Sequence, residues 1–188
     1  MANKQVGIFV GSLRKESFNR KIANYIIENQ PEGYDFRIIE IGELAMYNQD
    51  YDDSPSQPSN YSSFREEVKA LDAVLFVTPE YNRSMPAVLK NAIDIASRPY
   101  GKSVWNGKPG GVISSSIGAI GGFGSNHHLR QSLVFVNVLT LAQPEMYIGN
   151  VGDSFDDKGK LTNEDTAKYL KKFLEAYINW VELINAKK

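Results

Sequence analysis

Hydroxyl, amide and guanidinium groups gather in one short stretch directly behind the first apolar segment of the chain, residues 6–10. Residues 11–20 read GSLRKESFNR and lead into an expected helix. Free backbone N–H groups at a helix start favour a phosphate dianion, and Arg14 can hold two of its oxygens. Neither the dinucleotide fingerprint G-x-G-x-x-G nor the Walker P-loop is present. The plain alternative is that Ser17 or Asn19 caps the helix, while Arg14 and its lysine neighbour are solvated.

A second loop, residues 78–86 (TPEYNRSMP), follows the apolar segment 73–77. Its two prolines fix a loop that presents an aromatic ring, Tyr81, and an amide, Asn82. A planar ring system can lie against Tyr81 while amide groups of the loop contact its polar edge. The alternative is a rigid connection in which Tyr81 only covers the core.

Strand-like and helix-like patterns alternate along the chain, which predicts a single α/β domain over residues 1–188. In chain order the alternating strand and helix segments are 6–11, 18–29, 36–41, 62–71, 73–77, 86–97, 111–115, 126–142, 145–148 and 162–186. Right-handed crossovers then give a five-stranded parallel sheet with helices on both faces. The expected strand order is the flavodoxin-like 2-1-3-4-5. We expect segment 42–60 to be a long surface loop.

In an open parallel sheet, ligands bind beyond the carboxyl ends of the strands, beside the first strand. Residues 11–20 follow the first predicted strand, and residues 78–86 follow the third. The two loops are therefore expected to lie side by side and to form one site.

Taken together, the two loops resemble one known family. The first carries G-S-L-R-K-x-S-x-N at 11–19, and the second carries P-E-Y-N at 79–82, which runs into P-x-x-L-K-N-A-I-D at 86–94. This pairing is similar to the NADPH-dependent FMN reductase family of flavodoxin-like quinone, chromate and azo-dye reductases. The resemblance extends from residue 6 to about residue 149. Arg83 departs from the family pattern, in which an aromatic residue is common at this position.

The resemblance implies FMN as the cofactor and NADPH or NADH as the co-substrate. It assigns the FMN phosphate to the first loop, the isoalloxazine to the second, and a further contact to the loop after the fourth strand. The residues so assigned are Ser12, Arg14, Ser17, Phe18 and Asn19; Pro79, Glu80, Tyr81 and Asn82; and Ser115, Ser116 and Gly118. The glycine-rich segment 119–124 lets backbone approach the flavin, or it is a plain flexible loop before a helix.

The implied activity is a two-electron, ping-pong oxidoreduction in which the nicotinamide leaves before a quinone or similar acceptor (chromate, azo dye or free flavin) binds. The cofactor carries the hydride chemistry, so no side chain is expected to act as catalytic acid, base or nucleophile. Two alternatives stay open: a flavodoxin-type carrier of single electrons, and a flavin-binding interaction protein with little turnover. Such carriers tend to be strongly acidic, whereas this chain has a net charge of -1.

The composition excludes several other kinds of chemistry. With no cysteine, the chain can form no disulfide, thiol nucleophile or Cys-ligated metal site. The near-neutral charge gives no reason to expect nucleic acid or a membrane as partner. The sequence shows neither a signal peptide nor a membrane-spanning apolar run, which predicts a cytoplasmic protein.

No metal site is expected. The only histidines, His127 and His128, are adjacent and cannot share one helix face. Asp50, Asp52 and Asp53 lack the glycine and glutamate of a calcium loop, so we interpret them as part of a solvated loop.

The helix expected over 126–142 has apolar residues on more than one face. Such a helix is buried between the sheet and a partner, or it is covered by the chain's own loops. Because the resembled family forms dimers and tetramers, we expect a homodimer or homotetramer. Arg83 and Glu145 are a candidate charge pair across that interface, and solvated charges on one subunit are the alternative.

Overall fold

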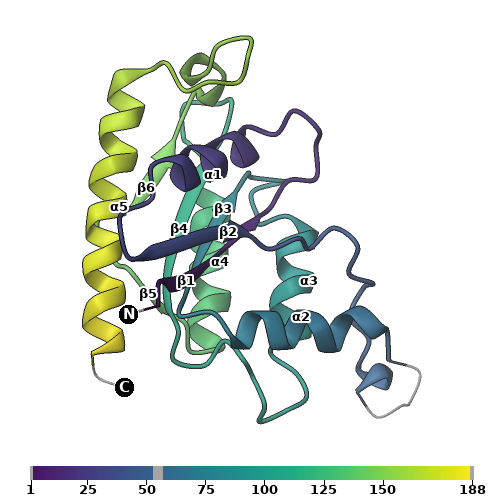
Figure 1. Cartoon of the computed structure of the whole chain (residues 1–188). Coiled ribbons are helices and arrows are strands. Elements are labelled where there is room, and N and C mark those ends of the chain that lie inside the picture. The colour runs from purple at the N-terminus through teal and green to yellow at the C-terminus, as the bar shows by residue number, and fades with distance from the viewer. Residues whose placement is uncertain (1, 53–56, 187–188) are drawn as a thin grey trace.

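A parallel sheet lies between two layers of helices (Figure 1). The computed structural model describes residues 2–52 and 57–186. Its strands are β1 Lys4–Val10, β2 Tyr34–Ile38, β3 Ala73–Thr78, β4 Pro109–Ser115, β5 Leu139–Thr140 and β6 Met146–Ile148. Its α-helices are α1 Phe18–Glu28, α2 Ser59–Lys69, α3 Ala87–Ala96, α4 Phe123–Phe135 and α5 Glu164–Asn185, with 3-10 turns at Gln49–Tyr51 and Val151–Ser154.

The strand order is β2-β1-β3-β4-β5 with every pairing parallel, which confirms the predicted flavodoxin-like order. The fifth position holds two short strands instead of one. β5 pairs with the start of β4, whereas β6 pairs with its end, from Ile113↔Met146 to Ser115↔Ile148. β5 and β6 therefore form one edge strand of the sheet, which residues 141–145 interrupt.

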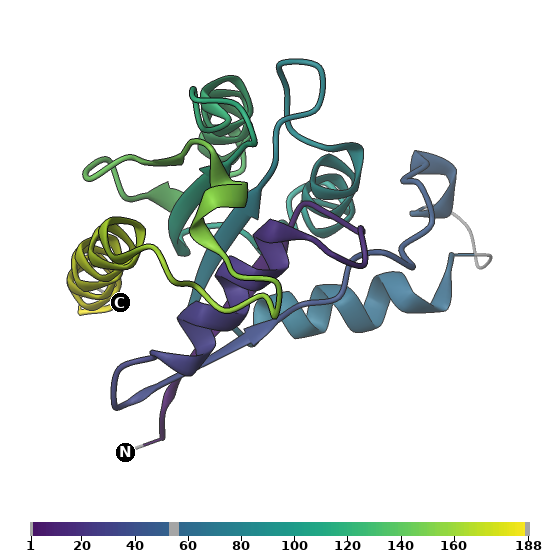
Figure 2. The ribbon, with the colours of Figure 1, turned by 90° about the horizontal axis from the view of Figure 1, so that it is seen from above.

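Alternate residues of the central strands point to opposite faces, and each face has its own hydrophobic core. Val6, Ile8 and Val10 of β1 belong to the core beneath α1 and α5. Phe9 belongs to the core beneath α2, α3 and α4. Figure 2 shows these two helical layers from above, on opposite sides of the sheet. Because both faces are covered, every residue of β3 and β4 is buried.

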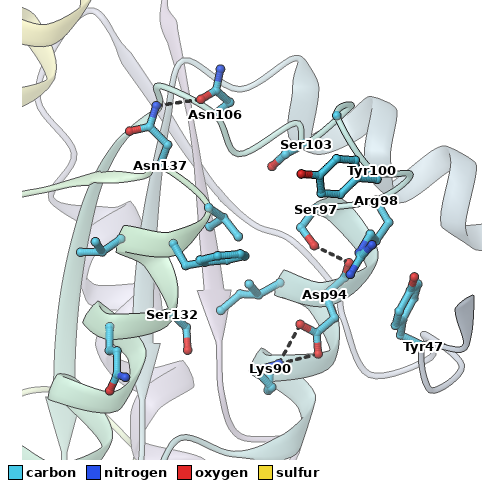
Figure 3. Close-up of a pocket in the computed structure, with 16 residues that line it drawn as sticks. Tyr47, Lys90, Asp94, Ser97, Arg98, Tyr100, Ser103, Asn106, Ser132 and Asn137 are labelled. Carbon is cyan, nitrogen blue, oxygen red and sulfur yellow. Dashed lines mark hydrogen bonds and ion pairs between the residues drawn. The ribbon is translucent and has the colours of Figure 1, made fainter.

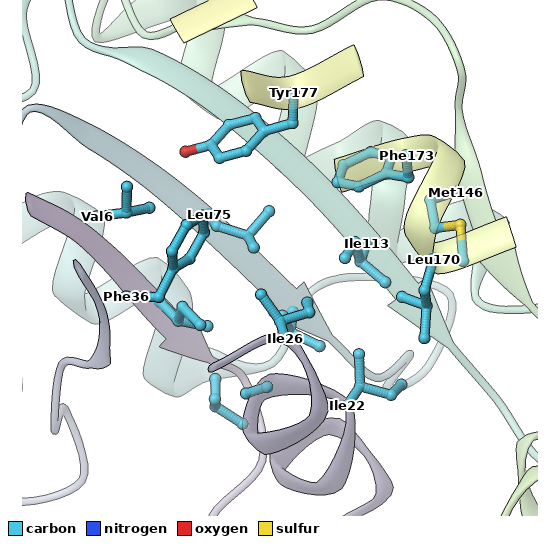
Figure 4. Close-up of a cluster of buried hydrophobic side chains, with 14 of the residues drawn as sticks. Val6, Ile22, Ile26, Phe36, Leu75, Ile113, Met146, Leu170, Phe173 and Tyr177 are labelled. Atoms are coloured by element: carbon cyan, nitrogen blue, oxygen red, sulfur yellow. The ribbon is translucent and has the colours of Figure 1, made fainter. Parts of the chain in front are cut away.

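Figure 4 shows the core beneath α1 and α5, where Phe36 and Leu75 of the sheet lie near Tyr177 of α5. Tyr177 is fully buried, and its hydroxyl donates a hydrogen bond to the Val74 carbonyl of β3 at 2.9 Å. Burial raises the pKa of the Tyr177 hydroxyl, so this group stays a neutral donor. No helix within the described ranges combines the length and the apolar character needed to cross a bilayer.

The helix expected over 126–142 was wrong at both ends. α4 begins at Phe123 and ends at Phe135, and Asn137 adopts a left-handed conformation (φ 57°) that turns the chain into β5. Residues 133–142 are mostly apolar, and such a run fits a buried helix and a buried strand equally well. The other predicted segments match observed elements, with ends that differ by up to three residues.

Of the long loop expected at 42–60, the described residues 42–52 and 57–58 are loop with a 3-10 turn at Gln49–Tyr51, and α2 begins at Ser59. The side chain of Asn91, buried on α3, holds this loop against the fold. Its Oδ1 accepts a hydrogen bond from the backbone N–H of Tyr47 at 2.8 Å, and its Nδ2 donates to the Ala45 carbonyl at 3.0 Å. The asparagine thus replaces the regular backbone pairing that the loop lacks.

The expectation that all the loop's aspartates are solvated was wrong for Asp52. Its side chain is 7% exposed, where it meets the guanidinium of Arg65 at 2.7 Å. The hydroxyl of Tyr47 also donates to Asp52 at 2.8 Å. A carboxylate buried in this way needs both partners, and they could not be inferred from the sequence because Arg65 lies on α2. Asp50 is exposed, and Asp53 lies outside the described residues.

Candidate functional site

Three loops leave the sheet along one edge, because β1, β3 and β4 are parallel neighbours that end in register. The pairing of β1 with β3 runs to Val10↔Val77, and the pairing of β3 with β4 continues to the end of β3. We name these segments the first loop (residues 11–17), the second loop (79–86) and the third loop (116–122). All three lie beyond the carboxyl ends of the strands, where open parallel sheets bind ligands.

Two serines of the first loop are buried although the loop lies at the surface. Ser12 is 5% exposed and Ser17 is 3% exposed. The Ser17 Oγ accepts a hydrogen bond from the backbone N–H of Arg20 at 3.3 Å, so Ser17 caps α1, as the plain alternative expected. The Ser12 Oγ accepts from the backbone N–H of Arg14 at 3.4 Å. Because both oxygens act as acceptors, each hydroxyl proton can still be donated to an anion.

Asn19 joins the first turn of α1 to the end of β4. Its side chain is buried, and its Oδ1 accepts a hydrogen bond from the Ser115 Oγ at 3.1 Å. The contact orients the amide, and the Nδ2 group makes no hydrogen bond with any described residue. Nδ2 is therefore the donor that Asn19 offers to a ligand. The backbone N–H groups of Phe18 and Asn19 add to it, because at the start of the helix they have no intrahelical acceptor.

Arg14 and Phe18 differ from the buried polar residues around them. Arg14 is exposed, and within the described ranges its guanidinium forms no ion pair. The ring of Phe18 stacks on Phe155 with 5.9 Å between centroids, and the ammonium of Lys21 lies 5.4 Å from the same ring. The ring of Phe18 is thus used in packing, and its backbone N–H is the group that stands among the donors of the first turn.

The second loop contains a two-residue hairpin turn between Tyr81 and Ser84. The Tyr81 N–H donates to the Ser84 carbonyl at 3.0 Å, and the Ser84 N–H donates to the Tyr81 carbonyl at 2.9 Å. Asn82 (φ 50°) and Arg83 (φ 66°) are both left-handed, which is typical of a type I′ turn. Tyr81 is 47% exposed, so the expectation that its ring only covers the core was wrong.

The carboxylate of Glu80 connects the second loop to α4. Its Oε2 accepts a hydrogen bond from the backbone N–H of Ser125, in the first turn of that helix, at 3.2 Å. The positive end of the helix dipole favours the negative charge. The hydroxyls of Thr78 and Ser125 form a second contact at 3.0 Å. Together these bonds fix the second loop against the helix that follows the third loop.

The second loop and α4 approach so closely that only glycine fits between them. A Cβ on Gly124 would lie 2.8 Å from the Arg83 carbonyl oxygen and 3.0 Å from the Glu80 carboxylate. Gly122, the N-cap of α4, has a φ of 78°, which L side chains rarely adopt. The glycine-rich segment 119–124 is therefore not a plain flexible connection, because the fold requires glycine at both positions.

The third loop is held by backbone hydrogen bonds to the segment after β6. The Ser116 N–H donates to the Ile148 carbonyl at 3.0 Å, and the Asn150 N–H donates to the Gly118 carbonyl at 3.3 Å. Ser116 is half-buried, whereas Gly118 and the neighbouring Ile117 are exposed. The loop thus has an anchored base and an exposed tip with free space around its glycine.

The residues that the resemblance assigned to FMN lie in these three loops, in the first turn of α1 or, for Ser115, at the end of β4. Hydrogen bonds join Ser12 with Arg14 and Ser116 with Gly118 inside their loops, and Asn19 with Ser115 between two elements. Three residues that hold the loops together were not predicted: Thr78, Ser125 and Gly124. Gly124 had a signal as a member of the glycine-rich segment, and Thr78 as the first residue of the segment 78–86; nothing in the sequence indicated Ser125.

The arrangement fits FMN at both ends of that molecule. At one end, the first turn of α1 offers N–H groups, the hydroxyls of Ser12 and Ser17, and the guanidinium of Arg14, which together match a phosphate dianion. At the other end, the exposed ring of Tyr81 and the exposed tip of the third loop offer surface and backbone N–H groups to a planar ring system.

A groove of about 990 Å³ lies away from these loops, between α3, α4 and the connection after α3 (Figure 3). Tyr47, Arg98, Tyr100 and Phe135 are among the residues that line it. None of the residues assigned to FMN lies in its wall. The groove is therefore a feature of the helical flank and not of the strand ends.

The two histidines of α4 are each engaged with a neighbour. His127 Nε2 lies 3.0 Å from the Tyr147 hydroxyl, and His128 Nδ1 lies 3.0 Å from the Ser84 hydroxyl. They thus connect α4 to two different segments, β6 and the second loop. Across residues 2–52 and 57–186, no three His, Asp or Glu side chains are grouped as a metal ion would require.

Comparison with known proteins finds relatives over nearly the whole chain. The family model described as NADPH-dependent FMN reductase matches residues 5–153. A quinone reductase of Pseudomonas putida is 52% identical over 181 residues, which are 96% of each chain. A 2-hydroxy-1,4-benzoquinone reductase of Burkholderia sp is 44% identical over 94% of this chain and 96% of that one. The structure of FerB, a flavoenzyme NAD(P)H:(acceptor) oxidoreductase from Paracoccus denitrificans, matches with a TM-score of 0.87 at 38% identity, over 95% of this chain and 97% of FerB.

Gly124→Ala tests whether the contact between α4 and the second loop positions a flavin. The added Cβ meets a backbone oxygen, so the loop must shift. We expect FMN affinity to fall about tenfold, because overpacking typically costs ~1–3 kcal/mol. Flavin fluorescence quenching in a titration of the apoprotein measures the affinity. Gly152→Ala is the matched control, since its Cβ would make only an ordinary contact, at 3.7 Å from Phe18. Equal affinities of both variants would contradict the prediction.

Proposed function

The chain belongs to the NADPH-dependent FMN reductase family and is an NAD(P)H-dependent oxidoreductase with FMN as its cofactor; we propose that it holds FMN across the three loops and reduces quinones. The observation that carries this site is the set of buried donors at the start of α1, namely Ser12, Ser17 and Asn19, beside the exposed Arg14. We also propose a cytoplasmic location, where both nicotinamide nucleotides are available.

In this proposal the first loop and the first turn of α1 bind the FMN phosphate, and the second and third loops bind the ring. The contributing residues are Ser12, Arg14, Ser17, Asn19 and the backbone of Phe18; Pro79, Glu80, Tyr81 and Asn82; and Ser115, Ser116 and Gly118. When bound, FMN supplies the hydride-accepting chemistry. The chain's own task is to orient that group and to leave one approach to it open.

Glu80 is a positioning residue in this scheme. Its carboxylate already accepts a hydrogen bond from the backbone N–H of Ser125, at the positive end of α4, and its side chain is 14% exposed. This arrangement uses the charge to hold the hairpin turn of the second loop at a fixed distance from α4. The adjacent Tyr81 then presents its ring from a fixed backbone.

A quinone suits the exposed surface beside the loops. Ile117 is 78% exposed and Ile120 is 61% exposed on the third loop, and Tyr81 is half-exposed on the second. An apolar planar acceptor gains from contact with such groups. Relatives named quinone reductase are 52% and 33% identical to the chain. Because the same surface must receive the nicotinamide, we infer a ping-pong order.

Anaerobic mixing of the flavin-loaded protein with NADPH or NADH tests the function. We expect the flavin absorbance to bleach by two electrons per flavin and to return when one equivalent of benzoquinone is added. Bleaching that stops at one electron per flavin would favour the flavodoxin-type carrier. No bleaching would favour a flavin-binding interaction protein. Either result would overturn the proposed reductase.

Arg14→Ala tests the phosphate end of the site. We expect FMN to bind about tenfold to a hundredfold more weakly, since a charge-assisted hydrogen bond is worth ~1.5–3 kcal/mol. Riboflavin, which lacks the phosphate, should bind the variant and the wild type about equally. Isothermal calorimetry with each ligand measures both effects, and Lys172→Gln on the exposed face of α5 controls for the lost charge. An equal loss for both ligands would show that Arg14 does not contact the phosphate.

We further propose a homo-oligomer, a homodimer or homotetramer, that forms over the groove between α3 and α4. Tyr100 and Phe135 at this groove are each 91% exposed, and Val134 is 68% exposed. Adjacent exposed apolar side chains of this size mark interaction surfaces. The opposite face of α4 packs on the sheet through Leu129 and Leu133, so α4 has apolar residues on two faces.

The charge pair of Arg83 and Glu145 expected across the interface stays a prediction, and within one subunit each charge has one distant neighbour. Arg83 lies 3.5 Å from Glu80, and Glu145 lies 3.8 Å from His127. Contacts this long contribute little, so we rest the proposed interface on the apolar face of α4 and not on this charge pair.

Phe135→Asp tests this interface. We expect the wild type to be a dimer or tetramer at micromolar concentration. The variant should be a monomer, because burying the aspartate charge in an apolar interface is costly. Light scattering measures the mass. Leu183→Asp is the control, because Leu183 is also exposed, at 50%, but lies on α5. A monomeric wild type, or a variant with the mass of the wild type, would contradict the proposal.

A further inference from the structure

Arg83 stands at a backbone position that suits glycine much better than arginine. It is the second central residue of the type I′ turn, with a φ of 66°. The common sequences of such turns place glycine there, because a Cβ is strained in the left-handed region. We therefore expect the side chain of Arg83 to have a role that offsets this backbone strain.

The side chain of Arg83 is not needed to hold the turn. The turn is closed by two backbone hydrogen bonds between Tyr81 and Ser84. It is fixed to α4 by the close approach of Gly124 and by the contact of Ser84 with His128. None of these contacts uses the side chain of Arg83.

The guanidinium itself is mostly in solvent. The Arg83 side chain is 77% exposed, and its one contact among the described residues is with Glu80 at 3.5 Å, the far limit of a hydrogen bond. Exposed pairs of this kind contribute little to stability. Glu80 is also satisfied without it, through the backbone N–H of Ser125. The positive charge is therefore left for a ligand.

The position of this charge limits what the ligand can be. Arg83 lies on the second loop, beside the ring end of the proposed site, whereas Arg14 lies at the phosphate end. FMN has its phosphate at the far end from its ring, so Arg83 does not serve the cofactor's phosphate. A molecule that places its nicotinamide on that ring carries its own phosphates away from the ring, past the loops that surround it.

We infer that Arg83 binds a phosphate group of the incoming nicotinamide nucleotide and thereby sets the affinity for this co-substrate. The inference rests on the proposed flavin site. Arginine is suited to this task because its planar fork can donate two parallel hydrogen bonds to phosphate oxygens. Both NADH and NADPH carry a pyrophosphate, and NADPH adds a 2′-phosphate. The shared chemistry is a phosphate oxyanion, and the choice between the two sources is left to experiment.

The test is nucleotide binding to flavin-loaded Arg83→Gln. Stopped-flow reduction under anaerobic conditions gives the nucleotide Kd and the limiting rate separately. We expect Kd to rise about tenfold with the limiting rate unchanged, as for loss of a contact made equally before and during hydride transfer. Calorimetry with NADP⁺ and NAD⁺ on the oxidised protein gives the same affinities without turnover. A rise in Kd for NADP⁺ alone identifies the 2′-phosphate as the group that Arg83 binds. A rise in Kd for both nucleotides identifies the pyrophosphate.

Arg83→Lys and Lys172→Gln are the controls. Lysine keeps the charge without the fork, so it should restore part of the affinity. Lys172 is exposed on α5, and its loss should leave both nucleotides unaffected. Unchanged affinity of Arg83→Gln for both nucleotides would overturn the inference. A change in the mass of the oligomer would also overturn it, because Arg83 would then contact a second subunit. A loss of affinity for the quinone alone would overturn it too, because Arg83 would then contact the acceptor.

Arg83→Gly separates the side chain from the turn. Glycine relieves the left-handed strain, so we expect a higher Tm together with the same loss of nucleotide affinity as Arg83→Gln. A lower Tm would mean that the arginine serves the fold, and would count against the inference. If the wild type itself is not reduced by either nucleotide, the proposed function fails. If the wild type is reduced and the variants bind nucleotide normally, only this inference fails.

Discussion

Because helices cover both faces of the sheet, its central strands can offer polar groups to a ligand only where each strand ends. The fully buried polar residues of β1, β3 and β4 are Thr78, Ser114 and Ser115, and all stand at carboxyl ends. Parallel pairing in register then brings these ends to one edge of the sheet. The burial that stabilises the fold therefore also determines where a binding site can form.

A few polar contacts turn this edge into a fixed structure. The bond from Ser115 to Asn19 connects β4 to α1, and the bond from Ser125 to Glu80 connects α4 to the second loop. Buried hydrogen bonds of this kind are costly to break, because the separated groups would lose their partners away from water. The first turn of α1 is thus fixed to β4, and the second loop is fixed to α4. Contacts within the protein therefore organise the site before any ligand binds.

The alternation of strands and helices was predictable from the sequence, since most elements are long enough to show their period and several are bounded by glycine or proline. The end of α4 was not, because an apolar run surrounds the asparagine that stops it. The residues assigned to FMN were predicted by resemblance. The contact of Ser125 with Glu80 was not predictable, because the two residues lie 45 positions apart in the chain. Asp52 shows the same limit: its burial depends on Arg65, which only the folded chain brings near.

Left-handed backbone is not distributed at random among the described residues. Three of the non-glycine residues with positive φ are asparagines, Asn82, Asn137 and Asn150, whose side chains tolerate this conformation. Asn137 and Asn150 simply turn the chain, after α4 and before the 3-10 turn Val151–Ser154. Arg83 has no such tolerance and depends on the packing of the second loop against α4 to stay in place. Glycine would form this turn with less strain than arginine. The exposed arginine at this position therefore fits the role in nucleotide binding that we infer for its charge.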